Sequence, residues 1–366
     1  MRERDRPVYW WLLGGAALIA LMVIVGGITR LTGSGLSITE WDLLGGALPP
    51  RTDAAWQTLL GKYLASPQGR LDNAHFALAD FKQVFWWEWI HRFLGRSIGV
   101  VFLVPFAFFV ATRRVTWPLT GRLVLILAMG AAQGLMGWLM VASGLVDDPR
   151  VSHYRLAAHL LLAFATFGVV VWTAMELSAG RWANSPGRAG ARLEPAPARL
   201  PALLFLALLG IQVTYGAFVA GLRAGFQYNT FPTMAGELVP PGMGGTSPLA
   251  ALTSNPVTVQ FVHRWLALAV LGTALLYWLR WRREPGLASA TRWMAGLALA
   301  QFGLGVLTIL RLPANPVFWG TVHQSGALAL LTAALAVHFR ASGSIPSRPA
   351  PASGTPATSS AAHSGG

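Results

Sequence analysis

Cysteine is absent from the 366-residue sequence. Its absence excludes disulfide bonds, thiolate catalysis, iron–sulfur clusters and cysteine-bound zinc, so histidine or carboxylate side chains must bind any metal. Charged residues are few as well: Asp, Glu, Lys and Arg make up 11% of the chain, and 14 acidic residues stand against 28 basic ones. Because soluble domains carry about 25% charged residues, the composition excludes an ordinary soluble fold.

Apolar residues are correspondingly abundant. They form 54% of the chain, which includes 16 tryptophans, and they gather in eight runs long enough to cross a hydrocarbon layer of about 30 Å as helices. The runs are 8–28, 89–110, 119–142, 154–176, 201–221, 259–279, 293–310 and 319–339. We therefore predict an all-α integral membrane protein with eight transmembrane helices in a lipid bilayer.

Basic and acidic residues alternate between successive loops. Arginines are concentrated before the first run and after every second run, whereas the other loops carry the acids, including Glu40, Asp53, Asp72 and Glu237. Because cytoplasmic loops are enriched in Lys and Arg, both termini are expected in the cytoplasm. The net charge of +14 then reflects membrane orientation, and no nucleic-acid partner is expected. The first run could be a secretory signal, but no small-residue cleavage motif follows it, so we expect it to be retained.

The sequence repeats itself on either side of a linker. Residues 177–200 are rich in Arg, Pro, Gly and Ala, and they separate an N-terminal part, 1–176, from a C-terminal part, 201–340, with four runs in each. QGLMGWLMVASGL in the first part resembles QFGLGVLTIL in the second. Each part returns the chain to the side where it began, which predicts two pseudo-symmetric four-helix bundles related by an axis along the membrane normal. The tail, 341–366, is Ser, Pro, Ala and Gly and is expected to be disordered.

Four histidines occupy matching places in this repeat. His91 and His159 lie near the outer starts of the second and fourth runs, and His263 and His323 near those of the sixth and eighth. A buried imidazole needs a polar partner, and two facing rings can bind one haem iron from opposite sides. Each ring could instead be an isolated hydrogen-bonded residue, but four at matching places favour up to two haem sites. The histidines outside the pattern are interpreted as structural: His75, His153, His338 and His363.

An acidic residue distinguishes the two histidine pairs. Glu88 precedes His91 by three residues, whereas Gln260 stands at the matching place before His263. An ionisable acid is costly inside a membrane unless it has a task. This difference favours acid–base or charge-stabilising chemistry in the first bundle and a haem holder or electron relay in the second. The alternative places Glu88 just above the membrane surface, in a belt of interfacial tryptophans.

Arginines accompany the histidines. Arg92 and Arg264 each follow a histidine directly, and Arg155 lies one helical turn before another. Because a guanidinium group pairs with a carboxylate in two-pronged geometry, these three arginines are candidates for binding haem propionates. The alternative is that they reach to the membrane surface without a ligand.

Long blocks of the chain resemble the haem A synthase family. The blocks include GGITRLTGSGLSITEW (26–41), WWEWIHRFLGR (86–96), SHYRLAAHL (152–160), QVTYGAFVAGLRAGFQYNTFPTM (212–234) and QFVHRW (260–265). The resemblance spans nearly all of the chain apart from the linker and the tail. It implies an oxidoreductase that converts the C8 methyl group of haem O to a formyl group by successive hydroxylation and dehydration, supplying haem A to cytochrome c oxidase. This chain lacks the outer-loop cysteine pair of some members and resembles the proteobacterial and mitochondrial type.

The resemblance also implies roles for individual residues. His91 and His159 would flank the iron of the substrate haem O, and His263 and His323 would bind haem b as a cofactor. Glu88 would act at the methyl group, either by stabilising a developing positive charge or by removing a proton from an attacking water. A bacterial inner membrane is the expected location, because no transit peptide precedes the first run.

Partners follow from the same resemblance. Haem O would come from haem O synthase, a protohaem farnesyltransferase, and an electron donor is needed that the sequence does not identify. Oxidase assembly factors and further copies of the chain are other candidate partners. Two rival functions use similar features: a dihaem electron-transfer protein like cytochrome b561 would need the paired histidines but not Glu88, and a transporter would need broken helices and midplane charges, of which the sequence shows neither.

Overall fold

The computed structural model describes residues 3–40, 46, 48–146, 149–180, 182 and 197–342. Its α-helices are α1 (Arg6–Leu31), α2 (Asp53–Ala65), α3 (Pro67–Leu71), α4 (Leu78–Ala111), α5 (Trp117–Gly144), α6 (His153–Ser178), α7 (Arg199–Gly221), α8 (Pro248–Ser254), α9 (Pro256–Trp281), α10 (Ala288–Arg311) and α11 (Pro316–Ala341). Within this described part, eight helices, all except α2, α3 and α8, are long and apolar enough to cross a membrane. The predicted all-α, eight-span membrane architecture is confirmed.

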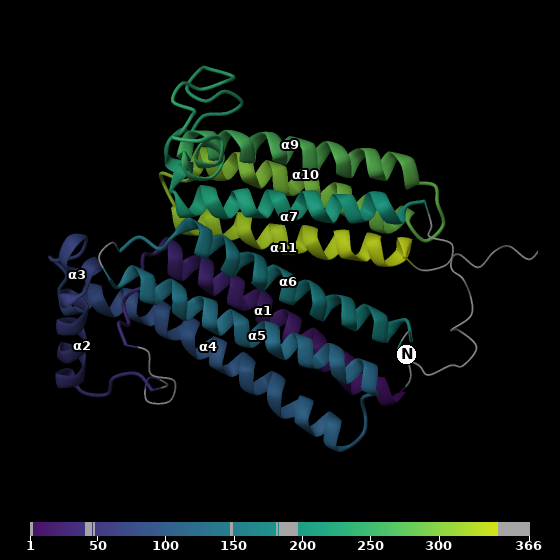
Figure 1. The fold of residues 1–366 in the computed structure, drawn as a ribbon, viewed down its shortest axis with the longest axis horizontal. Coiled ribbons are helices and arrows are strands. Elements are labelled where there is room, and N and C mark those ends of the chain that lie inside the picture. Colours follow the sequence, from purple (N-terminus) through teal and green to yellow (C-terminus); the bar gives the residue numbers. More distant parts are fainter. Residues whose placement is uncertain are drawn as a thin grey trace, which may run out of the picture.

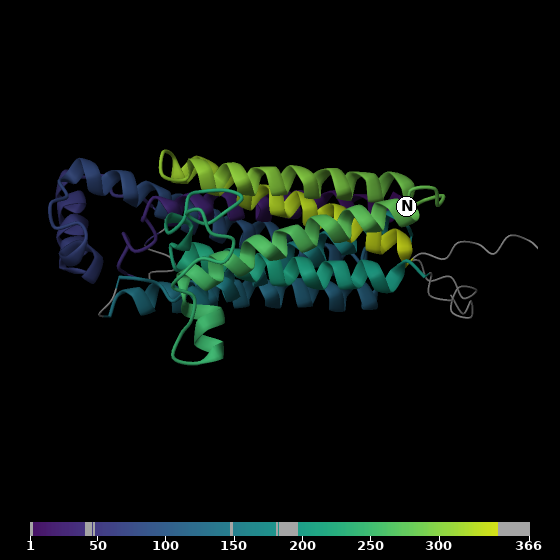
Figure 2. The same cartoon turned by 90° about the horizontal axis from the view of Figure 1, so that it is seen from above.

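The spanning helices form two groups of four (Figure 1). In the first group, packing runs in a closed cycle from α1 to α4, α5, α6 and back to α1; in the second it runs from α7 to α9, α10, α11 and back to α7. Consequently α4 and α6 stand at opposite corners of one bundle, and α9 and α11 at opposite corners of the other. The two views agree on this arrangement (Figures 1 and 2). Most of the predicted linker and all of the tail beyond Ser342 lie outside the described residues.

Helix α4 begins earlier than the sequence predicted. We expected the second span to start at Trp89, with His91 at its opening, but the helix begins at Leu78. The carboxylate of Asp80 accepts a hydrogen bond of 3.0 Å from the main-chain N–H of Ala77, which caps this extension. Phe81 and Phe85 of the added turns are buried against α2, so apolar contacts with another helix hold them, and no membrane is needed.

The two helices of the second bundle that carry His263 and His323 start in the same way. Asn255 and Asn315 are the N-caps, and each side-chain oxygen accepts a 3.0 Å hydrogen bond from the main-chain N–H three residues later. A proline follows each asparagine, where its missing N–H costs no hydrogen bond. Because His263 and His323 stand equally far along α9 and α11 from these starts, the two rings reach a similar depth.

The apolar cores fill one end of each bundle. The clusters draw on the start of α1 and the end of α6 in the first bundle, and on the start of α7 and the end of α11 in the second. The four histidines lie in the first half of α4, α6, α9 and α11, toward the end of the bundles from which α2, α3 and the loop after α7 project (Figure 1). The two largest apolar clusters therefore lie toward the end where α1 and α7 begin. A smaller cluster of Ala157, Ala217, Phe218 and Val259 lies near the histidines.

The bundles meet mainly through α1 with α11 and α6 with α7. At the first seam the side-chain amide of Gln324 donates a 2.7 Å hydrogen bond to the carbonyl of Val23. A Cβ atom at Gly27 would come within 2.9 Å of that amide, so glycine allows this close approach. Gln324, whose side chain makes this contact between the bundles, follows His323 directly in the sequence.

Candidate functional site

The second bundle brings two of the predicted histidines face to face. The rings of His263 on α9 and His323 on α11 have centroids 6.5 Å apart and planes at 86°. An iron bound by two imidazole nitrogens at about 2 Å each requires ring centres roughly 6 to 6.5 Å apart. The pair therefore fits one iron between opposite corners of the bundle.

The corresponding pair in the first bundle is also brought together. His91 on α4 and His159 on α6 are close enough to interact electrostatically, and Nδ1 of each ring is buried without a hydrogen-bond partner among the described residues. Buried ring nitrogens without partners indicate a missing polar or metal partner. The described part of the chain has no group of three or more His, Asp or Glu residues that could hold a bare metal ion. The four histidines instead lie as two separate pairs.

Each of the four rings packs against a glycine on a neighbouring helix. A Cβ atom added at Gly26 would lie 3.0 Å from Cε1 of His91, and one at Gly137 would lie 3.4 Å from Cε1 of His159. In the second bundle, a Cβ atom at Gly216 would lie 3.1 Å from Cε1 of His263, and one at Gly305 would lie 3.1 Å from Cε1 of His323. The glycines leave room for the rings, and three of these four positions would not take a methyl group without displacing the ring.

Three glutamines contact the histidines and were missed by the sequence reasoning. The side-chain amides of Gln133, Gln212 and Gln301 donate hydrogen bonds to the main-chain carbonyls of His159, His263 and His323, at 3.0, 3.2 and 2.8 Å. Each glutamine lies four residues before one of the ring-packing glycines. The recurring signal Gln-x-x-x-Gly was present in the sequence and could have identified them.

Glu88 lies within a hydrogen-bond network in the first bundle. Its side chain is buried, with a residue exposure of 2%. One oxygen accepts bonds from Nε and Nη2 of Arg92 at 3.0 and 2.6 Å, and the other accepts bonds of 2.7 Å from the hydroxyl of Ser37 and the N–H of Ile38. Both carboxylate oxygens of Glu88 are therefore hydrogen-bonded inside the protein, whereas its height relative to the membrane surface stays a prediction.

The second bundle repeats this network without the carboxylate. Nη2 and Nη1 of Arg264 donate to the carbonyls of Tyr228 and Thr230, just as Arg92 donates to those of Ile38 and Glu40. These carbonyls stand at equal offsets in the chain (228 − 38 = 190; 230 − 40 = 190). Gln260 replaces Glu88 and donates to Tyr228 at 2.9 Å, and Nε of Arg264 is buried with no hydrogen-bond partner in the described part. The loops after α1 and α7 are thus fastened alike, and only the first carries a buried ion pair.

Arg155 and two of the histidines interpreted as structural contact neighbouring helices. Nη1 of Arg155 donates to the carbonyl of Leu139 on α5 at 3.1 Å. Among the histidines interpreted as structural, His338 packs against Trp172 with ring centroids 5.4 Å apart, and His153 packs against Phe218 at 5.5 Å. His363 lies outside the described residues.

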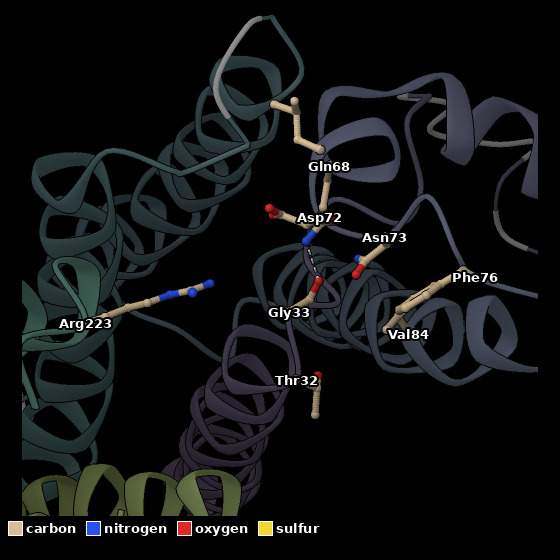
Figure 3. Close-up of a pocket in the computed structure, with 9 residues that line it drawn as sticks. Thr32, Gly33, Gln68, Asp72, Asn73, Phe76, Val84 and Arg223 are labelled. Atoms are coloured by element: carbon tan, nitrogen blue, oxygen red, sulfur yellow. Dashed lines mark hydrogen bonds between the residues drawn. The ribbon is translucent and has the colours of Figure 1, made fainter. Parts of the chain in front are cut away.

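A cavity of about 480 Å³ opens at the end of the molecule that carries α3, where the two halves meet. It is lined by the turn after α1, by α3 and the turn after it, and by Arg223 from the second half. Figure 3 shows Arg223 reaching across toward Gly33, Gln68 and Asp72, with the hydrogen bond of 3.0 Å from Gln68 to the carbonyl of Gly33. Residues of both halves therefore border one opening, which lies just beyond the end of α1.

A sequence model of the COX15-CtaA family, described as cytochrome oxidase assembly protein, matches residues 9–335. The chain belongs to this family. The match covers both bundles and all four paired histidines, so the repeated arrangement lies within the family's own span.

Several relatives are similar over nearly their full length. Heme A synthase of Parvibaculum lavamentivorans is 45% identical over 330 residues, covering 90% of this chain and 92% of the relative. Heme A synthase of Bradyrhizobium diazoefficiens is 44% identical over 91% of each chain. Heme A synthase of Nitrosospira multiformis is 43% identical over 91% of this chain and 93% of the relative.

Proposed function

We propose that this protein is a haem A synthase, an oxidoreductase that converts the C8 methyl group of haem O to a formyl group for cytochrome c oxidase. The observation that carries the proposal is the asymmetry between the bundles: each has a histidine pair from opposite corners, but only the first has a buried carboxylate one turn from a histidine. Family membership and the haem A synthases among the relatives support it.

The second bundle is proposed as the site of a haem b cofactor. Its rings fit one iron at their separation of 6.5 Å, and the glycines on α7 and α10 leave room beside them. When bound, haem b would supply one-electron transfer between the substrate haem and an external redox partner that takes up or provides the balancing electrons. His263 and His323 would bind the haem b iron. Arg264, whose buried Nε has no hydrogen-bond partner among the described residues, would pair with a propionate.

The first bundle is proposed as the substrate site, with His91 and His159 flanking the iron of haem O. Arg155 remains our candidate for a propionate of this haem. Arg92 also stays a candidate, although the hydrogen bonds described for it go to Glu88 and to loop carbonyls. Its principal role is then to hold the carboxylate of Glu88 in place.

The network around Glu88 favours one of its two predicted roles. Each carboxylate oxygen already accepts two hydrogen bonds, so Glu88 would have to give up one of them before it could remove a proton from water. A fixed negative charge needs no such rearrangement. We therefore propose that Glu88 stabilises positive charge that develops at the methyl carbon.

The proposed setting is the inner membrane of a bacterium with both termini in the cytoplasm. The outer helices α2, α3 and α8 and the loop after α7 then lie on the opposite side, and the cavity at their base opens there. Haem O from a protohaem farnesyltransferase, an electron donor, oxidase assembly factors and further copies of the chain are the proposed partners.

The direct test is to express the protein together with a source of haem O, extract the bound haem and identify it by chromatography. A synthase yields haem A. A dihaem electron-transfer protein would bind haem through the same histidine pairs but would return only the haems supplied, and that result would contradict the proposed reaction.

The glycine beside His91 gives a graded test of the substrate site. Because a methyl group at Gly26 would press on the ring at 3.0 Å whereas one at Gly137 would make ordinary contact with His159 at 3.4 Å, Gly26→Ala should weaken haem O binding by about tenfold. Gly137→Ala is the matched control and should bind nearly as wild type. Spectral titration of the purified proteins with haem O measures both, and equal affinities would argue against the assignment of His91.

A further inference from the structure

One position distinguishes His91 from the other three paired histidines. The residue four places before each ring-packing glycine is a glutamine in three cases and Met22 in the fourth. Four residues make about one helical turn, so this side chain lies on the same helix face as the glycine. The three helices with glutamine are α5, α7 and α10, and the one with methionine is α1.

Each glutamine is tied to its histidine through the main chain. The amide nitrogens of Gln133, Gln212 and Gln301 donate to the carbonyl of the paired histidine, as described above. Two of them also lie 3.3 Å from a ring nitrogen, in His159 and His323. Each carboxamide therefore sits against both the main chain and the ring of a ligand residue.

The oxygen of each carboxamide is still unused. Oε1 of all three glutamines is buried without a hydrogen-bond partner among the residues described. An imidazole that binds a metal through one nitrogen carries a proton on the other, and a hydrogen-bond acceptor there fixes the ring and raises its basicity. In His159 and His323, however, the atom that faces the ring is the amide nitrogen, a donor, and the oxygen of Gln301 lies against Gly326. The three glutamines therefore hold their histidines through the hydrogen bond to the main-chain carbonyl.

Met22 can neither donate a hydrogen bond to a main-chain carbonyl nor place an amide against the ring of His91. Its thioether has no hydrogen to donate and is only a weak acceptor, and its methyl carbon packs against α4, 3.3 Å from where a Cβ of Gly95 would stand. Nδ1 of His91 is buried and lacks a partner in the described part of the chain. Because Nδ1 of His159 and His263 is unpartnered too, the distinguishing feature is the position itself: His91 is the one paired histidine whose neighbouring glycine has no glutamine one turn before it.

We propose that the three glutamines are positioning residues that fix His159, His263 and His323 as lasting iron ligands, and that Met22 leaves His91 as an exchangeable ligand. The second bundle, with two fixed ligands, then retains its haem, whereas the first, with one fixed and one exchangeable ligand, can admit a haem substrate and release the product. This inference rests on the proposed function, because it assigns the first bundle to the haem that turns over.

The test measures haem release from the full-length protein loaded with both haems. An excess of apomyoglobin captures released haem, and the absorbance change separates a fast phase from the first bundle and a slow phase from the second. Met22→Gln should slow the fast phase by about tenfold, and Gln212→Met should speed the slow phase by about tenfold, as for other residues that support metal ligands. Met22→Leu, which changes shape without adding an amide, should release haem at the wild-type rate.

An unchanged fast phase in Met22→Gln would overturn the inference, as would equal slowing in Met22→Leu, because packing alone would then explain the effect. If Gln212→Met does not fold, Gln301→Met makes the same test on the other ligand of that bundle. Haem A formation by the wild type is measured separately. If the wild type forms haem A but Met22→Gln leaves the fast phase unchanged, only the inference about Met22 is overturned. If the release rates shift as expected but the wild type forms no haem A, only the proposed function is overturned.

Discussion

Replacement of Glu88 by glutamine is expected to lower the rate of haem O conversion by about 100-fold, equivalent to about 2.7 kcal/mol of transition-state stabilisation. The variant should keep its bound haem and accumulate haem O or a hydroxylated intermediate. The expectation follows from the position of the carboxylate, buried one turn from His91 and held by four hydrogen bonds. Chromatography of extracted haem over time measures the rate.

The second bundle indicates that this substitution will not unfold the protein. Gln260 and Arg264 already stand where Glu88 and Arg92 stand in the first bundle, and Arg264 is held by loop carbonyls alone. The glutamine variant therefore copies an arrangement that this fold accepts. An unchanged haem absorbance spectrum is the check that the loss of activity comes from chemistry and not from misfolding.

Ser37→Ala is the graded companion to that variant. It removes one of the four donors to Glu88, at 2.7 Å, and leaves the charge and the ion pair with Arg92. Because a hydrogen bond to a charged group contributes about 1.5–3 kcal/mol, we expect a loss of roughly tenfold in rate, smaller than that of Glu88→Gln. A Glu88→Gln variant that makes haem A at the normal rate would contradict the role proposed for this carboxylate.

Replacement of His263 by glycine should remove haem b from the second bundle and leave the first occupied. The ring of His263 faces that of His323 at 6.5 Å, and no other described residue of that bundle is placed to substitute for it. The b-type absorbance should fall by at least tenfold, as expected when a metal site loses a ligand. Haem A formation should fall with it, because the proposed electron path runs through that haem.

Free imidazole provides the control for this variant. The glycine leaves a space the size of the lost ring, so millimolar imidazole should restore the b-type spectrum if only the ligand is missing. A His263→Gly spectrum identical to that of the wild type would contradict the ligand assignment, whereas restoration by imidazole would exclude unfolding as the cause.

The sequence predicted those features that depend on composition and repetition. Long apolar runs between arginine-rich loops were enough to identify eight spans, and the repeat was enough to pair four histidines. The start of α4 could not be found in this way, because Phe81 and Phe85 are buried against α2 outside the apolar run. A hydropathy pattern does not reveal which helix another helix packs against.

The contacts of the site were predictable only in part. The difference between Glu88 and Gln260 was visible in the sequence, but the bonds from Ser37 and Ile38 depend on how the loop after α1 folds back. The arginines were predicted to bind propionates, which stays a prediction, and the hydrogen bonds of Arg92 and Arg264 to loop carbonyls were not foreseen. The sequence shows which side chains can form hydrogen bonds, whereas their partners depend on the tertiary fold.

The most direct test of the account is the haem content of the purified protein, resolved by type and by number per chain. Two haems per chain are predicted for the wild type, one of them b-type, and one haem for each of His159→Ala and His323→Ala, with only the latter losing the b-type haem. A single haem per chain lost equally from both variants, or a protein that remains colourless after incubation with haem, would contradict the assignment of a separate haem to each histidine pair.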